Sequence, residues 1–199
     1  MSANPAPAAV LQLDEFQKDD TFASVFHALR AAGEPGFYKH DFETAMRESG
    51  ILPDDRRVRE TFQKLRQISD RELIDFATFC ELVNRSNAAL ILRAIRGELI
   101  IPQFLEFSAG LSEIFRSVEH NRKGEVATYI PQLARVDPER FAMAVCTIDG
   151  QRFALGDDDE AFCAQSTSKP ISYCAALNLL GTETVHSFIG REPSGRSFN

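Results

Sequence analysis

Apolar residues in the first hundred positions recur at the spacing of amphipathic helices. Phe22, Val25, Phe26 and Leu29 stand at i, i+3, i+4 and i+7, which predicts a helix with one buried face. The same spacing recurs in three later segments, so we expect four helices in close succession. The later patterns are carried by Phe42 and Met46, by Val58, Phe62 and Leu65, and by Phe76, Phe79, Leu82 and Val83.

Glycine and aspartate residues mark the expected ends of these helices. Gly33 and Gly50 follow the first and second patterns, where a glycine accommodates the left-handed residue that often closes a helix. Asp54 or Asp55 precedes the third pattern, and a carboxylate there can accept hydrogen bonds from the first free amides. The segments between the helices are therefore predicted to be short turns.

Two of these connecting segments repeat one another. "FYKHDF" begins at Phe37 and "IDFATF" begins at Ile74, and each places an apolar residue five positions before a phenylalanine. This arrangement resembles the second half of an EF-hand loop, where the apolar residue forms a short strand shared between two hands. We therefore expect Phe37 and Ile74 to pair.

The ligand positions of these loops argue against calcium. A calcium-binding loop needs oxygen ligands at positions 1, 3, 5 and 12, with glycine at position 6. With Phe37 taken as position 8, the first loop has Arg30 at position 1, and the second loop has Arg71 at position 5 and Thr78 at position 12. Because an arginine repels a cation, we expect no metal site here and interpret the helical pair as a packing or protein-contact module.

The remaining pattern changes from helical to mixed. Residues 86–125 are predicted to be helical with a break at Pro102, and their apolar character suggests a helix buried between two domains or subunits. "FAMAVCTIDGQRFALGD" (141–157) predicts two strands joined by a type I′ turn at Asp149–Gly150. The apolar positions from Ile171 to Leu180 predict a buried helix that ends at Gly181. One hairpin does not make a stable sheet, so we expect this second domain to be incomplete.

A serine and a lysine with possible catalytic chemistry lie at the start of that last helix. Ser166 and Lys169 are three residues apart, so they share a helix face and the lysine can reach the serine hydroxyl. The positive end of the helix favours an alkoxide on Ser166 and disfavours the ammonium form of Lys169. Pro170 suits the first turn, where its missing N–H leaves no bond unmade. The spacing alone also fits two polar residues on a wet surface, because such pairs arise by chance.

Composition and charge exclude several classes of function. The chain is 44% hydrophobic and 26% charged with a net charge of −7, which is typical of a globular protein and unfavourable for binding nucleic acid or an anionic membrane. The four cysteines show no metal-ligand spacing, and we interpret them as buried free thiols. Residues 1–19 are rich in proline and alanine and are expected to be disordered or loosely attached.

Three motifs together identify a family. "YIPQLARVDPERFAMAVCTIDGQRFALGD", "FCAQSTSKPISY" and "LGTETVHSFIGREPSGRSFN" resemble the glutaminase family, in particular the animal-type, phosphate-activated enzymes. The resemblance extends from about Asp20 to Asn199 and includes an EF-hand-like helical block without calcium ligands. It implies a mixed fold, in which an all-α EF-hand-like four-helix domain precedes the start of an α+β domain like that of the serine β-lactamases.

The resemblance also implies a reaction and its residues. Glutaminases hydrolyse L-glutamine to L-glutamate and ammonia; Ser166 matches their nucleophile and Lys169 the residue that activates it. Tyr129 and Gln165 match positions that line the glutamine site. By themselves, Tyr129 suits packing against Leu133 and Gln165 a solvent-facing helix start. The family further implies phosphate as activator, no other cofactor or metal, a homo-oligomer (dimer or tetramer) and a mitochondrial location, with the cytoplasm as the alternative because no presequence is visible.

These expectations divide the chain into four parts. They are the N-terminal residues 1–19, the EF-hand-like domain at 20–86, a helical linker at 87–124, and the first part of the catalytic domain at 125–199. Because the family extends well beyond "EPSG", we expect a fragment or a short isoform, and we expect these 199 residues alone to lack activity. A non-enzymatic regulatory or oligomerisation module is the alternative.

Overall fold

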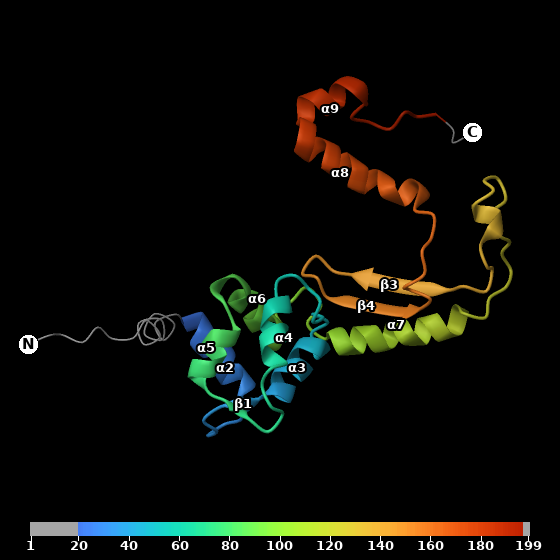
Figure 1. The fold of residues 1–199 in the computed structure, drawn as a ribbon. Coiled ribbons are helices and arrows are strands. Elements are labelled where there is room, and N and C mark those ends of the chain that lie inside the picture. Colours follow the sequence, from blue (N-terminus) through green and yellow to red (C-terminus); the bar gives the residue numbers. More distant parts are fainter. Residues whose placement is uncertain (1–19, 197–199) are drawn as a thin grey trace, which may run out of the picture. The chain divides into compact units, whose positions relative to one another are not determined.

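The computed structural model describes residues 20–196, which form two compact units (Figure 1). Among these residues, the first unit comprises 20–123 and 139–158, and the second unit comprises 124–138 and 159–196. The predicted disorder of residues 1–19 and the last letters of the "EPSGRSFN" motif lie outside the described residues.

An EF-hand-like region forms the first part of the first unit. Its helices are α2 (Asp20–Leu29), α3 (Lys39–Glu48), α4 (Arg59–Leu65) and α5 (Phe76–Leu82). Strands β1 (Phe37–Tyr38) and β2 (Leu73–Ile74) pair antiparallel, with Phe37 opposite Ile74. The predicted strand pairing between the two loops is therefore confirmed. Gly36 permits it, because a Cβ at this position would lie 2.3 Å from the carbonyl oxygen of Ile74.

Phenylalanine side chains fill the centre of this region. The ring of Phe26 lies 5.8 Å from that of Phe37 and 5.3 Å from that of Phe76, and Phe22 and Phe37 each contact Phe79 edge to face. Such pairs contribute roughly 0.5–1.5 kcal/mol each beyond the burial of their area. The buried faces are the ones that the helical spacing predicted.

Cationic side chains occupy both connecting loops of the EF-hand-like region. The guanidinium of Arg30 donates to the carbonyl oxygen of Glu34, 2.5 Å away. In the second loop, Lys39 Nζ donates to Ile68 O at 3.1 Å and forms an ion pair with Asp70 at 2.5 Å. A backbone carbonyl in each loop is thus bonded to a charge that the chain itself supplies.

The helix boundaries agree with the glycine signal at Gly50 but not with the aspartate signal, and α2 ends at Leu29, four residues before the predicted closing glycine, Gly33. α3 ends just before Gly50, which has the left-handed φ of +82°. The prediction that Asp54 or Asp55 caps the third helix is wrong, because the residue before α4 is Val58. Asp55 instead accepts from the backbone N–H and side chain of Arg57, so its carboxylate stabilises the turn that leads into the helix.

The helical segment after α5 is divided as the sequence predicted. α6 (Arg85–Ile95) and α7 (Phe104–Val118) lie on either side of Pro102. Ile91 and Ala94 of α6 are buried in the same core as α2 and α3. The interpretation of this helix as one buried between domains is therefore wrong for α6, which belongs to the core of the helical region. No pattern in the sequence marks the predicted boundary between the EF-hand-like domain and the linker at residue 86.

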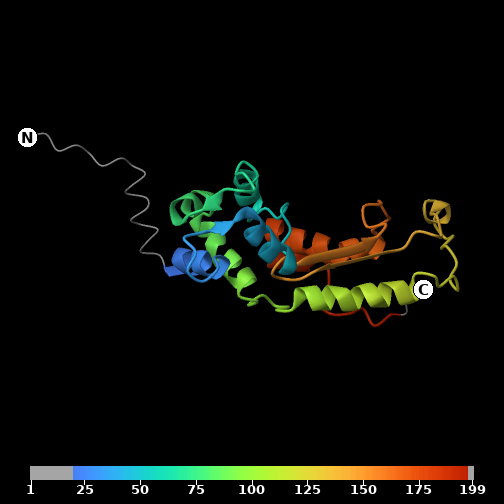
Figure 2. The same cartoon turned by 90° about the horizontal axis from the view of Figure 1, so that it is seen from below.

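A two-stranded hairpin completes the first unit. β3 (Ala142–Cys146) and β4 (Arg152–Gly156) pair antiparallel, and the hairpin lies along α7 in both views (Figure 2). The ring of Phe141 stacks on Phe115 of α7 at 4.8 Å. Gly156 allows this approach, because a Cβ there would lie 2.1 Å from Phe141 O.

The turn of this hairpin differs from the predicted type I′ turn. That turn needs a positive φ at both central residues, but only Gly150 has one, at +86°. Thr147 N donates to Gln151 O, and Gly150 N donates to Thr147 O, which gives a three-residue loop with a glycine in the left-handed region. Asp149 remains in ordinary backbone geometry, where its side chain is free to bond elsewhere.

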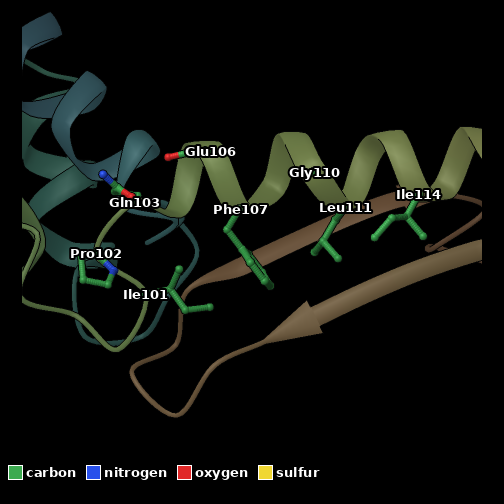
Figure 3. Close-up of a pocket in the computed structure, with 8 residues that line it drawn as sticks. All are labelled: Ile101, Pro102, Gln103, Glu106, Phe107, Gly110, Leu111 and Ile114. Atoms are coloured by element: carbon green, nitrogen blue, oxygen red, sulfur yellow. The ribbon is translucent and has the colours of Figure 1, made fainter.

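A shallow groove runs along α7 (Figure 3). Its volume is about 490 Å³, and its apolar walls come from Ile101, Phe107, Leu111 and Ile114. None of the residues that the sequence predicted for a site lines it.

The second unit contains the helices of the predicted nucleophile. η1 (Leu133–Arg135) and η2 (Gln165–Ser168) are 3₁₀ turns, and η2 runs directly into α8 (Lys169–Leu180), which α9 (Thr182–Phe188) follows. Gly181 closes α8 as predicted. The prediction that α8 is buried is wrong within the described chain, because Ile171 and Leu179 are 74% and 79% exposed. Its apolar residues therefore form an uncovered face.

The cysteines are free, but only one is buried. Burial raises the pKa of the Cys80 thiol to about 11. Cys146, Cys163 and Cys174 are exposed, so the expectation of buried thiols is wrong for these three. No helix in the part of the chain that the structure describes is long and apolar enough to cross a membrane.

Candidate active site

Ser166 and Lys169 lie on one continuous turn of the second unit. Ser166 belongs to η2, and the backbone N–H of Lys169 donates to Ser166 O. In a 3₁₀ turn, residues three apart lie one above the other, so the two side chains start from the same face. Pro170 occupies the first turn of α8, as the sequence predicted.

The hydroxyl of Ser166 differs from those of its neighbours. Thr167 Oγ1 donates to Ala164 O, and Ser168 Oγ donates to Gln165 O at 2.7 Å. These two hydroxyls are thus used to hold the turn. Within residues 20–196, Ser166 Oγ has no hydrogen-bond partner, and the residue is exposed. The local fold therefore leaves one of three consecutive hydroxyl groups available for chemistry.

Gln165 stands in an unusual backbone conformation directly before Ser166. Its φ is +45°, the one positive value among the non-glycine residues that the structure describes. A non-glycine residue in this region costs on the order of 1–3 kcal/mol, and such residues cluster at active sites. The conformation turns the chain sharply at the point where the 3₁₀ turn begins, and the sequence carries no glycine that would have signalled it.

Tyr129 and Gln165 meet in the second unit. The hydroxyl of Tyr129 donates to Gln165 Oε1 across 2.7 Å, although 36 residues separate the two in the sequence. The ring of Tyr129 is 73% exposed, so it does not pack against Leu133 in a core. The bond fixes the carboxamide of Gln165, the residue directly before Ser166, and the N–H groups of this carboxamide have no partner among the described residues. Three of the four predicted site residues therefore lie close together along this turn.

Lys169 is the fourth predicted site residue. It is exposed, and its Nζ makes no ion pair or hydrogen bond with the residues that the structure describes. A lysine ammonium has three donors and no acceptor, so as it stands this one is solvated. Lys169 thus starts from the same face of the turn as Ser166, and its head group has no partner among the described residues.

A tyrosine–histidine pair lies next along the same helix. Tyr173 stands four residues after Lys169, hence on the same face of α8, and its hydroxyl is 3.0 Å from His186 Nε2 on α9. The two rings meet edge to face at 5.9 Å. Neither Tyr173 nor His186 is among the residues that the sequence predicted for the site. The i, i+4 spacing from Lys169 was the signal that could have identified Tyr173.

The described residues contain no cluster of side chains that could bind a metal ion. No group of three or more histidine, cysteine, aspartate or glutamate side chains within residues 20–196 is arranged to bind an ion. The groups gathered around Ser166 are hydroxyl, carboxamide and ammonium. Such groups serve nucleophilic attack on a carbonyl and the binding of a polar substrate.

Comparisons with known proteins agree with this chemistry. Residues 124–199 match the family model described as Glutaminase, and residues 21–102 match one described as EF-hand domain. The chain is 38% identical over 199 residues to "Putative glutaminase 3" of Caenorhabditis elegans, covering 94% of this chain and 31% of that protein. It is 36% identical over 173 residues to "Glutaminase liver isoform, mitochondrial" of Mus musculus, covering 85% and 29%. A "Glutaminase" of Corynebacterium efficiens is 46% identical over 99 residues, 50% of this chain and 22% of that protein.

These figures confirm the resemblance that the motifs indicated. They also show that the chain spans less than a third of the length of these relatives.

Proposed function

We propose that this chain, whose residues 124–199 belong to the glutaminase family, supplies the nucleophile-bearing part of an enzyme that hydrolyses L-glutamine to L-glutamate and ammonia. The proposal is made for a protein of the relatives' length, of which this chain covers 31% in the first comparison. The observation that carries it is the turn from Gln165 to Lys169, which combines a free serine hydroxyl, a strained residue before it and a lysine on the same face.

In this proposal Ser166 is the nucleophile. Its Oγ attacks the side-chain carboxamide carbon of glutamine while the neutral amine of Lys169 accepts the hydroxyl proton. The proton is passed to the departing nitrogen, so ammonia leaves and a γ-glutamyl ester of Ser166 remains. Water then attacks the ester carbonyl and gives its proton to Lys169, which returns it to Ser166 Oγ as glutamate is released.

The remaining parts of the turn have binding roles. The N–H of Ser166 at the start of η2 is suited to stabilise the oxyanion of each tetrahedral intermediate. Tyr129 orients the Gln165 carboxamide through the hydrogen bond of 2.7 Å, and the amide N–H groups of Gln165 then meet the α-carboxylate or the γ-carbonyl of the substrate. The proposed fold around this turn is that of a serine β-lactamase-like domain that begins near residue 125.

Regulation and location are proposed from the family resemblance. We propose a homo-oligomer activated by phosphate, in which the EF-hand-like region and the segment from 87 to 124 precede the catalytic domain. One relative is named a mitochondrial liver isoform, so a mitochondrial location is proposed here as well.

Glutamine turnover tests the proposed reaction directly. Ammonia release from L-glutamine is measured with the 199-residue chain and with a protein of the relatives' length that contains it, each with and without phosphate; L-asparagine is the control substrate. We expect the longer protein to turn over glutamine and the 199-residue chain not to do so. Absence of turnover in the longer protein with phosphate present would disprove the proposed function.

A further inference from the structure

The loop of the β3–β4 hairpin is bound by the helical region through side chains of both. Gln151, at the end of this loop, has no solvent exposure. Its Nε2 donates to Ser49 O at 2.8 Å and to Ile101 O at 2.9 Å, and its Oε1 accepts from Ile101 N at 3.1 Å and from Thr147 Oγ1 at 3.4 Å. All four hydrogen-bonding positions of this amide are filled. Because the partners are backbone groups about 50 and 100 residues away, the contact joins three distant segments.

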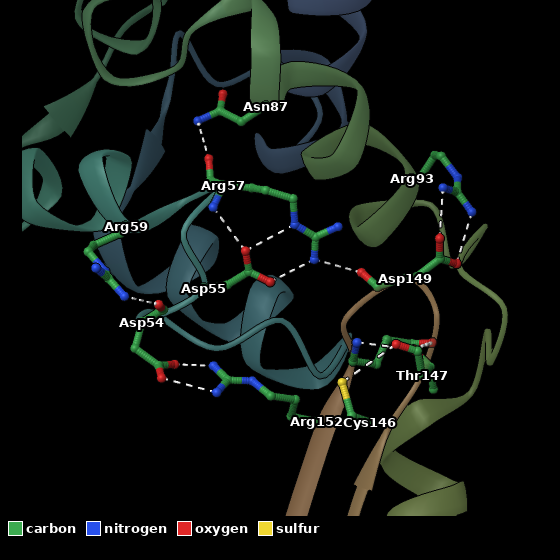
Figure 4. A network of polar contacts seen from close by, with 11 residues as sticks. Asp54, Asp55, Arg57, Arg59, Asn87, Arg93, Cys146, Thr147, Asp149 and Arg152 are labelled. Carbon is green, nitrogen blue, oxygen red and sulfur yellow. Dashed lines mark hydrogen bonds and ion pairs between the residues drawn. The ribbon is translucent and has the colours of Figure 1, made fainter. Parts of the chain in front are cut away.

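Asp149 makes a second connection from the same loop. Its carboxylate accepts hydrogen bonds from both terminal nitrogens of Arg93 at 3.0 Å (Figure 4). It also accepts from the backbone N–H of Ile100 at 2.7 Å. The carbonyl oxygen of Asp149 accepts from Arg57 at 2.7 Å. The two-nitrogen contact fixes the direction of approach as well as the distance. One loop residue is thereby bound by α6, by the turn before α4 and by the turn before α7.

The shape of the helical surface is matched to a glycine. A Cβ on Gly150 would lie 2.2 Å from Arg57 Nη2, so the loop can approach only because no side chain is present. Arg57 is itself held, since Asp55 accepts from its side chain and Asn87 donates to its carbonyl oxygen. The Asp55 carboxylate thus orients the guanidinium, and Asn87 holds the backbone that carries it.

The hairpin continues this contact beyond the loop. Arg152 N donates to Gly50 O at 2.8 Å, and its guanidinium pairs with Asp54. β4 ends at Gly156, and residues 157–164 then lead to Gln165 and Ser166. The strand that the helical region holds is therefore the one directly before the nucleophile in the chain.

We propose that the helical region contains a docking surface for the hairpin loop 147–151, and that this docking positions the start of the glutaminase-type domain. The surface is made by Arg57, Arg93, Ser49 O and the backbone of Ile100 and Ile101. The segment that binds this surface is the Thr-x-Asp-Gly-Gln turn of the same chain, which presents an acidic side chain, a glycine and a carboxamide in succession. The helical region then fixes the position of the hairpin at the start of the catalytic domain. The expected effect of this docking on catalysis rests on the function proposed above.

Acid should weaken this docking. Hydrogen bonds from Arg93 and then from Ile100 hold the pKa of Asp149 below its usual value of 3.8, and Arg57 and Arg152 do the same for Asp55 and Asp54. A carboxyl whose pKa is lower in the folded protein stabilises above its unfolded pKa, and this contribution is lost as the pH falls through the folded pKa. We therefore expect the urea midpoint of the first unit to fall below about pH 4.

The Asp149→Ala variant provides the comparison for this pH dependence. Its urea midpoint should fall less between pH 5 and pH 3 than that of the wild type, because one of the titrating groups is gone. Asp158→Ala, which removes an exposed aspartate without a partner among the described residues, should follow the wild-type curve. Parallel curves for all three proteins would show that Asp149 carries none of the pH dependence.

Residue-level hydrogen exchange on the 199-residue chain tests the docking itself. The amides of Arg152, Ile100 and Ile101 report on it, and the amide of Val83, bonded to Phe79 O in α5, reports on the helical core. In Arg93→Ala and in Asp149→Ala we expect the reporter amides to exchange at least about tenfold faster while Val83 is unchanged. The double variant should exchange like Asp149→Ala, because the loss of Asp149 already removes the contact that Arg93 makes with its carboxylate.

Two matched variants and an activity measurement complete the test. Arg96→Ala changes the residue that directly follows α6 and that has no side-chain partner among the described residues. This variant and Asp158→Ala should exchange like the wild type. In a protein of the relatives' length, Arg93→Ala should lower kcat for glutamine about tenfold, since small misplacements of catalytic groups are costly, with KM changed less. Unchanged reporter amides, or an active wild type whose Arg93→Ala variant turns over at the same rate, would overturn the inference. An inactive wild type would count against the proposed function alone, and the exchange data would then decide the docking.

Discussion

Ser166→Ala in a protein of the relatives' length should lower glutamine turnover by at least about a thousandfold. The substitution removes the one hydroxyl of η2 that the turn does not use for its own hydrogen bonds. Without a nucleophile no acyl intermediate forms, and the remaining rate comes from substrate binding alone. Lys169→Ala should have a loss of similar size, because a nucleophile and its base act as a unit and their effects do not add.

The control for this pair lies on the same helix. Ser172→Ala makes the same chemical change at an exposed position of α8 where the hydroxyl has no partner in the described structure, and it should leave turnover within about threefold of wild type. Circular dichroism and the oligomeric state should be unchanged in all three variants. If Ser166→Ala keeps more than about a tenth of the wild-type rate, Ser166 is not the nucleophile.

The elements that the sequence predicted well are those in which local and tertiary requirements agree. The buried faces of α2, α3 and α5 follow the helical spacing, and Phe37 pairs with Ile74 because the two loops repeat the same pattern. Ser166 and Lys169 could be proposed as a pair because a spacing of three is a local property, and their catalytic roles stay a prediction. Tyr129 and Gln165 depended on the family resemblance, since nothing local links residues 36 positions apart.

The errors have both local and tertiary causes. Asp55 does not cap α4, because its carboxylate binds Arg57. Asp149 does not form a type I′ turn with Gly150, because its side chain and carbonyl are bound by Arg93 and Arg57. The positive φ of Gln165 has no signal in the sequence either, since strain of this kind is imposed by the surrounding structure.

Gln151→Glu should be the most destabilising single-atom change in the first unit. The substitution replaces Nε2, which donates to two carbonyl oxygens at 2.8 and 2.9 Å, with an oxygen that cannot donate when ionised. Ser49 O and Ile101 O would then face a buried negative charge, and breaking a buried polar contact on one side in this way costs roughly 3–5 kcal/mol. A loss of this size is a large fraction of the roughly 5–15 kcal/mol by which a domain is stable.

The pH dependence of this variant separates its cause from simple loss of packing. Burial raises the folded pKa of an acid above its unfolded value, so the penalty is present above the unfolded pKa and is relieved as the pH falls. Gln151→Glu should therefore recover stability between about pH 7 and pH 5, whereas wild type should lose stability only in stronger acid. Gln103→Glu is the matched control, because it makes the same change at an exposed position and should shift stability by less than about 0.5 kcal/mol. Urea unfolding at both pH values tests this prediction. A Gln151→Glu midpoint equal to that of wild type at pH 7 would mean that the carboxamide is not buried between the two carbonyls. The docking of the hairpin loop would then lose its central contact.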